Sequence, residues 1–285
     1  MNVKKAPVLA MVLLTLTLPL FTSELEIYIQ SEEELTVFLN EAATYPEEKL
    51  TVYLEPGVYA VPVVMPPNTS LIGAGPGQTF LEGVQGTEAV LTLSYNNTIR
   101  NLEILMPETD NIYAVFGRAQ KDIHLENVRI RGNQKFGVYL ESCGDIKIIN
   151  CSLQDHDYGV FIKDSNDFLV QSSLFIHNNF SGLYLDRSEG TVCCNLFAFN
   201  PGHGIFSHGT YLYYRRLFAQ RRYEIQNNLF FHNGPEKRGH MKNLITDESN
   251  IILQELDPPD PDTGIPPGLS ELNEKYGISL PLVND

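Results

Sequence analysis

The middle of the chain repeats a pattern of short segments in which apolar and polar positions alternate. One phrase, apolar-x-apolar-x-Asn-x-x-apolar, occupies residues 123–130 and returns at 146–153, with looser copies at 168–175, 190–197 and 223–230. A second phrase, Gly-apolar-aromatic-apolar, starts at Gly137, Gly159, Gly182 and Gly204, which by subtraction are 22, 23 and 22 residues apart. Alternation over so few residues predicts short strands. The nearly constant spacing of 22 or 23 residues between repeats predicts that these strands stack in successive coils.

One polar position of the first phrase also repeats. Asparagine occupies it at 101, 127, 150 and 227, with Ser172 and Cys194 in the copies between. Aligned asparagine side chains can bond to one another from coil to coil at a turn. The pattern therefore predicts a single parallel β-helix over residues 49–256, with coils stacked about 4.8 Å apart.

The two ends of the chain predict different structures. Lys4 and Lys5 precede a short apolar run from 8 to 21, which is typical of a secretory signal over residues 1–23. We therefore expect a secreted or periplasmic protein that has no transmembrane domain once the signal is removed. The alternative is that the segment is not cleaved and anchors the protein in the membrane. Residues 24–48 are expected to cap the first coil with a helix from Ser31 to about Ala43. Residues 257–285 form a Pro-rich, irregular tail with a short helical stretch near 270–276.

Two segments near the start of the repeats resemble a known superfamily. The segment 50–59, LTVYLEPGVY, and the segment 70–77, SLIGAGPG, look like the opening coils of pectin lyase-like proteins, and the later repeats are similar to the repeats of that superfamily. The resemblance covers about residues 26–255 and implies an all-β fold, a right-handed parallel β-helix. It implies little about activity, because many chemistries share this scaffold.

The second phrase predicts an aromatic stripe on one face of the solenoid. Its flanking aliphatic residues should point inward and its aromatic residue outward. Aromatic rings one coil apart can bind sugar rings, so we expect a substrate-binding surface there. The alternative is that the C-terminal tail covers the stripe, or that the rings stack only for stability. The stripe consists of Phe116, Tyr139, Phe161, Tyr184 and Phe206.

A row of charged residues is expected beside this stripe, two positions further along each strand. It comprises Arg118, Glu141, Lys163, Asp186 and His208. The row is either a ladder of surface ion pairs or, together with His203, a set of acid and base groups. The predicted catalytic candidates are Glu141, Lys163, Asp186, His203 and His208.

Charge is distributed unevenly along the chain. The formal net charge of −15 argues against nucleic-acid binding, which needs a basic surface. Residues 211–242 nevertheless carry a net charge of +5 (seven basic minus two acidic residues), and the repeat lengthens there. Arg215 and Arg216, together with Arg118, are expected to bind the carboxylates of a uronate chain. The alternative is that this basic segment pairs with acidic segments of the same chain.

Three chemistries of the superfamily can be tested on the residues. Gly202-His203-Gly204-Ile205 resembles a polygalacturonase motif, but the paired aspartates of those hydrolases have no counterpart at 179–182, which reads NFSG. Lyase chemistry needs a base such as Lys163 and often Ca²⁺, although neighbouring carboxylates would raise the lysine pKa. Residues 239–244 resemble a late segment of mannuronan C5-epimerases, whose catalytic motif is absent.

The remaining residues leave two functions open. Cys143, Cys151, Cys193 and Cys194 include no C-x-x-C pair, so a structural zinc site is not expected, and buried small side chains are favoured over a disulfide. Ca²⁺ is the one cofactor that lyase chemistry would suggest, and a monomer is expected.

Two functions are compatible with these residues. One function is a lyase or epimerase that acts on an acidic polysaccharide. The other is a non-catalytic β-helix that binds a glycan or a protein at the cell surface or in the periplasm.

Overall fold

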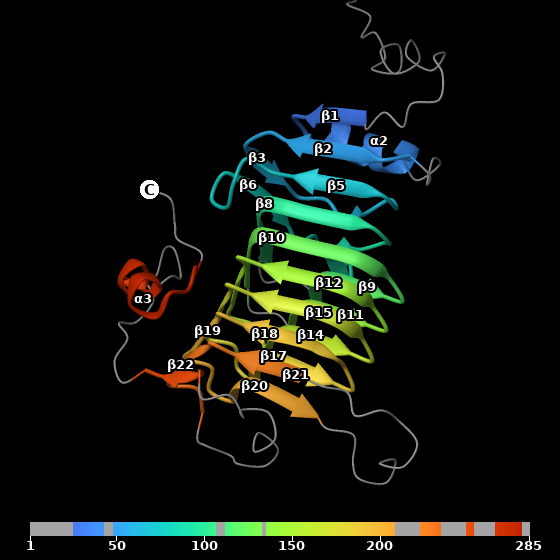
Figure 1. Ribbon diagram of the computed structural model, residues 1–285. Helices are drawn as coiled ribbons and strands as arrows, with labels where there is room; N and C mark the ends of the chain where they lie inside the picture. The colour runs from blue at the N-terminus through green and yellow to red at the C-terminus, as the bar shows by residue number, and fades with distance from the viewer. Residues whose placement is uncertain are drawn as a thin grey trace, which may run out of the picture.

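The chain forms a stack of parallel strands wound in successive coils (Figure 1). The computed structural model describes residues 25–42, 48–106, 112–132, 135–208, 223–234, 249–253 and 266–280. Within these residues seven complete coils run from β2 to β20. The predicted all-β parallel β-helix is confirmed. Residues 1–23, predicted as a signal, and the basic loop with Arg215 and Arg216 lie outside the described residues.

Each coil contributes strands to three faces. The first face contains β1 (Leu25–Ile29), β2 (Leu50–Leu54), β5 (Thr69–Ile72), the first parts of β8 (Asn97–Met106) and β10 (Lys121–Gly132), β12 (Gly144–Ile149), β15 (Asn166–Gln171), β18 (Gly190–Cys193) and β21 (Tyr223–Gln226). The second face contains β3 (Gly57–Tyr59), β6 (Thr79–Glu82), the later parts of β8 and β10, β13 (Ser152–Gln154), β16 (Leu174–Ile176), β19 (Leu196–Ala198), β22 (Leu229–Phe231) and β23 (Ile251–Ile252). The third face contains β4 (Val63–Val64), β7 (Ala89–Thr92), β9 (Tyr113–Arg118), β11 (Phe136–Glu141), β14 (Tyr158–Lys163), β17 (Ser181–Asp186) and β20 (His203–His208).

The corner between the first and second faces is made by the predicted asparagine position. Asn101, Asn127 and Asn150 have φ angles of 53–55°, a left-handed conformation that asparagine tolerates better than most residues. The Asn127 amide Nδ2 donates to Asn101 Oδ1 at 2.9 Å, and Asn150 Nδ2 donates to Asn127 Oδ1 at 3.4 Å. The ladder is therefore confirmed for these coils, and Ser172, Cys194 and Asn227 share its left-handed backbone.

Two further asparagine ladders lie inside the C-terminal coils and were not predicted. Asn195 Nδ2 donates to Asn228 Oδ1 of the next coil at 2.9 Å and to the Val170 carbonyl of the previous coil at 3.0 Å. Asn200 and Asn233 are paired in the same way, at 2.7 Å. Since buried amide groups are costly unless they are bonded, these ladders hold the coils in one register.

The repeated glycines of the third face are explained by close packing between coils. A Cβ atom added to Gly159 would lie 2.6 Å from the carbonyl oxygen of Gly182, the equivalent residue of the next coil. Gly137 has the same relation to the Gly159 carbonyl, at 2.5 Å. At Gly137 and Gly159 the next coil thus leaves no room for a Cβ atom, whereas the equivalent position of the coil before Gly137 holds the small residue Ala114.

A helix closes the N-terminal end, as expected. Helix α2 (Glu32–Ala42) buries Leu35 and Leu39 against the first coil. The Ser31 hydroxyl accepts from the Glu34 amide at 3.2 Å, and the Glu34 carboxylate accepts from the Gln30 amide at 2.9 Å. The Ser31 bond caps the start of the helix, and the Glu34 bond holds the residue before the cap against the first turn. No helix in the described part of the chain is long and apolar enough to span a membrane.

The C-terminal helix α3 (Leu269–Tyr276) lies against the second face, close to β19 and β22 (Figure 1). Three buried residues of this tail, Leu269, Ile278 and Leu280, belong to one apolar cluster with outward residues of the second face. Those outward residues are Leu174, Ile176, Leu196, Ala198, Leu229 and Phe231. The described part of the tail therefore covers the second face, and its buried residues do not pack on the predicted aromatic stripe of the third face.

Candidate functional site: a double aromatic row on the third face

The predicted aromatic stripe is present on the third face. The strands β9, β11, β14, β17 and β20 pair in register, so that each ring lies directly beside the ring of the next coil. Ring centroids are 6.0, 5.2, 4.4 and 5.0 Å apart from Phe116 to Phe206, and the first three pairs are stacked. We call the five residues the front row: Phe116, Tyr139, Phe161, Tyr184 and Phe206.

A second row of rings lies beside the front row and was not predicted. Its members, Tyr113, Phe136, Tyr158 and Phe180, stack with centroids 5.4, 5.2 and 5.5 Å apart. A signal for this back row exists in the sequence, because Phe136 and Tyr158 each stand immediately before the glycine of the second phrase. The third face therefore carries a surface two rings wide.

The two rows pack against each other in a herringbone. Tyr158 is inclined by 85° to Phe161 and by 89° to Tyr184, at centroid distances of 5.4 and 5.5 Å. Edge-to-face contact of this kind is favourable for aromatic pairs. The rings partly cover one another, so most are half-buried, whereas Phe180 at the end of the back row is 56% exposed. The surface is rigid and apolar but remains accessible.

The tyrosine hydroxyls of this surface are neutral at physiological pH. Burial raises the pKa of Tyr113, Tyr139, Tyr158 and Tyr184 above the ordinary value. A protonated phenol both donates and accepts hydrogen bonds. The rows can thus supply apolar contact and hydrogen bonds together, which is the combination that a pyranose ring presents.

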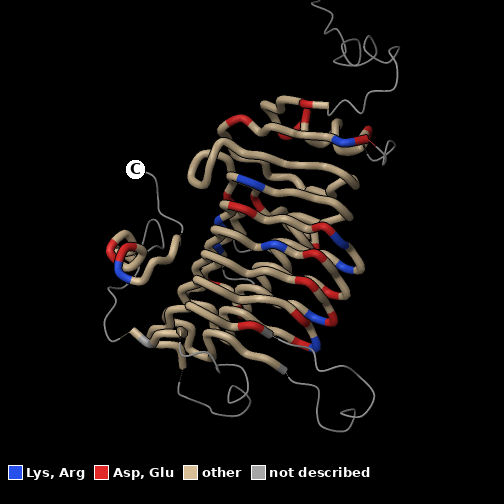
Figure 2. Tube along the Cα trace, viewed as in Figure 1, with Lys and Arg blue, Asp and Glu red and all other residues tan. Residues whose placement is uncertain are grey.

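The charged row lies beside the front row, in the predicted register and along one edge of the coils (Figure 2). Glu141 is bound from both sides: Arg118 Nε lies 2.8 Å from its Oε2, and Lys163 Nζ lies 2.6 Å from its Oε1. The Lys163 hydrogen bond is the largest cause of the lowered Glu141 pKa, and the same bond raises the Lys163 pKa. This part of the row is a ladder of ion pairs, and Lys163 is held in its charged form.

Asp186 differs from the rest of the row. Its residue is 8% exposed, and its Oδ2 lies 3.3 Å from Arg187 Nη1. Arg187 is itself held by two bonds to Asp164, at 2.6 and 2.7 Å. Asp186 Oδ1 is buried and has no hydrogen-bond partner among the described residues. A buried carboxylate oxygen without a donor is unusual and calls for an explanation.

The two histidine candidates are placed differently. The backbone of His208 aligns with Asp186 in the charged row. His203 aligns with Ser181 at the start of its strand, and its ring lies 4.9 Å from the Phe206 ring. The structure thus brings Glu141, Lys163 and Asp186 into one row, whereas His203 lies at the aromatic end of the same face.

Two cations flank the aromatic rows. The Arg118 guanidinium lies over the Phe116 ring, 5.4 Å from its centroid, and the Lys135 ammonium lies over Phe136 at the same distance. Lys135 was not among the predicted residues. Each cation is attracted to the negative face of its ring.

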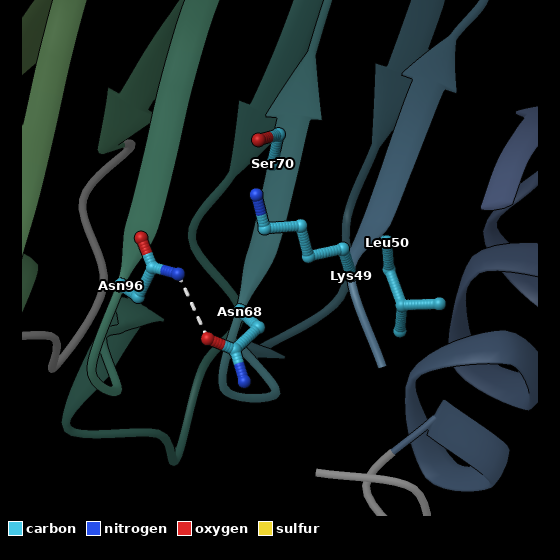
Figure 3. A pocket seen from close by; sticks show the side chains of 5 residues that line it. All are labelled: Lys49, Leu50, Asn68, Ser70 and Asn96. Atoms are coloured by element: carbon cyan, nitrogen blue, oxygen red, sulfur yellow. Dashed lines mark hydrogen bonds between the residues drawn. The ribbon is translucent and has the colours of Figure 1, made fainter. Parts of the chain in front are cut away.

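Other polar features of the described residues are smaller. They contain no group of three or more His, Cys, Asp or Glu side chains arranged to hold a metal ion; Ca²⁺ dependence stays a prediction. A pocket at the N-terminal end is lined by Lys49, Leu50, Asn68, Ser70 and Asn96 (Figure 3). There Asn96 Nδ2 donates to Asn68 Oδ1 at 2.8 Å, and both residues have left-handed backbones. This pocket is a corner of the coils, away from the aromatic rows.

Comparison with protein families places the chain in one class. The family model described as "right handed beta helix region" matches residues 84–254, which is more than half of the chain. The chain belongs to this family, and the predicted pectin lyase-like fold is confirmed. No curated protein sequence matches it.

Solved structures resemble the chain at low sequence identity. A tailspike protein, gp49 from Acinetobacter baumannii bacteriophage Fri1, matches with a TM-score of 0.51 and 13% identity, over 74% of this chain and 45% of that protein. The chain therefore spans less than half the length of the tailspike. A pectin methylesterase from Aspergillus niger matches with a TM-score of 0.38 and 10% identity, over 91% of this chain and 96% of the esterase. The A-module of the mannuronan C-5 epimerase AlgE4 from Azotobacter vinelandii matches with a TM-score of 0.31 and 13% identity, over 71% and 72%.

Proposed function

We propose that this protein binds a polysaccharide along the third face, across the front and back rows of aromatic rings. One observation carries the proposal: nine rings lie side by side in two rows on a single face, and the buried residues of the C-terminal tail pack elsewhere. Aromatic rings provide apolar contact for the faces of sugar rings, and an accessible apolar surface of this extent usually marks a binding site.

The preferred ligand is an acidic polysaccharide that contains uronate residues. Arg118 and Lys135 lie over rings of the two rows and supply positive charge at the edge of the surface. In the sequence, the basic residues of 211–242, including Arg215 and Arg216, follow directly after β20, the last strand of the aromatic face. Arginine binds carboxylates through paired hydrogen bonds, so these residues suit a uronate chain.

Two further considerations support a polysaccharide ligand. The tailspike protein that shares this fold is described as a capsular polysaccharide depolymerase. The N-terminal residues 1–23 have the pattern of a secretory signal, which would bring the protein to the periplasm or outside the cell, where polysaccharides of this kind are found. A monomer fits this function, since one chain contains the whole aromatic surface.

A second candidate function, catalysis by a lyase or epimerase, is favoured by Asp186 alone. Its Oδ1 is the buried carboxylate oxygen that lacks a donor among the described residues, and it lies on the strand that carries Tyr184. The Asp186 side chain as a whole is 12% exposed, so its carboxylate could take a proton from a sugar bound beside Tyr184. Lys163 is a poor proton acceptor in this geometry, because its bond to Glu141 raises its pKa. In the catalytic proposal Glu141 and Lys163 therefore position the ligand, and Asp186, with His203 or His208, handles protons.

Binding is tested by glycan array and isothermal titration calorimetry with neutral and uronate-containing polysaccharides. The variants are Tyr184→Ala and Phe161→Ala, which each remove a ring from the front row. Tyr28→Ala is the matched control, since Tyr28 stacks on Tyr53 of the first face at 4.9 Å in the same way. Binding by the native protein and the control, with at least a tenfold loss in the two front-row variants, is the expected result. Equal binding by all four proteins contradicts the proposed surface.

Catalysis is tested on the polysaccharides that bind. Ultraviolet absorbance of unsaturated sugar ends detects a lyase, and proton NMR of the polymer detects an epimerase, each with and without added Ca²⁺. If Asp186 handles protons, Asp186→Asn abolishes turnover while the dissociation constant stays within a fewfold of the native value. Binding without any turnover by the native protein would leave the non-catalytic function as the one supported.

A further inference from the structure

Two adjacent thiols lie outside the aromatic site and take no part in it. The four cysteines are free. Cys143 and Cys151 are buried, as predicted for small core side chains, whereas Cys193 and Cys194 are half-buried and reachable from solvent. Cys193 ends strand β18 on the first face, and Cys194 occupies the asparagine position at the corner with the second face.

The backbone at this corner brings both thiols to the outer side. Adjacent residues of a regular strand point to opposite faces, which would bury one of the two. Val192 points into the core, so Cys193 points outward. Cys194 has a φ of 59°, and this left-handed residue interrupts the alternation, so its side chain lies beside the outer apolar cluster instead of within the core. The two cysteines are adjacent in the chain and both lie on this outer side, so their sulfur atoms can converge on a single bound ion.

The surroundings of the pair keep it in the thiol form. The residues aligned with Cys193 in the neighbouring coils are Gln171 and Gln226, both uncharged. Burial, followed by the contact with Cys194, raises the Cys193 pKa to about 11. A thiolate is the species that attacks alkylating reagents, so this pair is a weak nucleophile at neutral pH. Chelation differs, because a thiophilic ion displaces the protons as it binds.

We propose that Cys193 and Cys194 form a dithiol site for a thiophilic metalloid or metal ion that takes two sulfur ligands, with trivalent arsenic as the probe. With phenylarsine oxide, two arsenic–sulfur bonds form and the arsenic–oxygen bond breaks. The oxygen leaves as water with the two thiol protons. Arsenic stays trivalent, so no oxidant or reductant is needed.

The test uses the full chain, reduced and then freed of reductant, with phenylarsine oxide at neutral pH. Intact-mass spectrometry should show one phenylarsine adduct per folded chain, and peptide mapping should place it on the segment that contains both cysteines. Cys193→Ser and Cys194→Ser should each lose the adduct. The matched control is Cys143→Ser combined with Cys151→Ser, which should keep it. Iodoacetamide at the same pH should modify the native pair far more slowly than phenylarsine oxide does.

Two outcomes overturn the proposal. One is an adduct that forms only after unfolding, which would show that the two sulfurs do not converge in the native fold. The other is an adduct that maps to a different segment or survives in Cys193→Ser. Peptide mapping of the native chain needs no variant, so the result stands even if a serine variant folds poorly.

Discussion

At the scale of single residues, the tightest constraint is the contact between glycines of successive coils. Gly159→Ala would place a methyl group 2.6 Å from the Gly182 carbonyl, and a backbone carbonyl within a sheet cannot move aside. We expect a loss of about 1–3 kcal/mol in the free energy of unfolding, measured by urea denaturation. Gly144→Ala is the control, because its nearest neighbours lie 3.6 Å or more away; equal losses in both variants would contradict this explanation.

Glu141 provides a second residue-scale prediction, which concerns pH. Because its pKa is lowered in the folded protein, its pairing stabilises the fold above the unfolded pKa of about 4.3 and is lost as pH falls through the lower, folded value. Glu141→Gln should therefore lower the urea midpoint slightly at neutral pH, by less than Gly159→Ala does. The difference from the native protein should shrink steadily below about pH 4. A difference that grows on acidification would show that the pairing is not the cause.

At the scale of elements, the C-terminal tail protects the second face. Leu269 is 3% exposed within the cluster that also holds Leu196 and Phe231, so Leu269→Ala should cost about 2–4 kcal/mol of stability. Leu272→Ala, which changes a partly buried residue of the same helix, should cost less. Thermal unfolding followed by circular dichroism measures both. Glycan binding per folded molecule should be the same in the two variants, since the tail and the aromatic rows lie on different faces.

The same elements show which parts of the structure a sequence can predict. Strands with strict alternation, such as Gly159-Val160-Phe161-Ile162, were predicted with the correct outward residue, because a period of two defines a face. Three strands of the second face, β16, β19 and β22, are only three residues long and apolar throughout, as in Leu196-Phe197-Ala198. Such a run indicates burial on both sides but does not identify what covers it. Its partner, the tail, lies dozens of residues away along the chain, so local pattern could not reveal the contact.

The candidate site was predicted in part, for a related reason. The front row and the charged row follow from the repeat frame, since each occupies one fixed position per coil. The back row was missed because its residues lie at or just before the start of each strand, outside the Gly-apolar-aromatic-apolar phrase; Phe136 and Tyr158 precede its glycine, and Phe180 precedes Ser181, the first residue of β17. The pairing of Glu141 with two cations depends on side-chain conformations, which a sequence pattern does not define.

At the scale of the whole molecule, the proposed function predicts that the length of the aromatic surface limits the length of the polysaccharide segment bound. The front row spans five coils, and neighbouring strands lie about 4.8 Å apart. This spacing is close to the length of one sugar residue along a chain that runs parallel to the solenoid axis. Affinity for uronate oligosaccharides should therefore rise with each added residue and level off at about five residues. Calorimetry on a size series measures this, and a plateau at a disaccharide would indicate that the ligand crosses the rows instead of following them.

The pairing of equivalent residues from coil to coil has a consequence for how such a protein can change in length. Gly144 is paired with Asn166, 22 positions further on, and the corner, core and aromatic positions of one coil match those of the next. Deleting residues 144–165 would join Cys143 to Asn166 in the same strand register with one ring fewer in each row, and it would remove Asn150 from the asparagine ladder and Lys163 from the charged row. Gain or loss of a single coil would therefore lengthen or shorten the proposed polysaccharide-binding surface by one ring in each row while the parallel stacking of coils is kept.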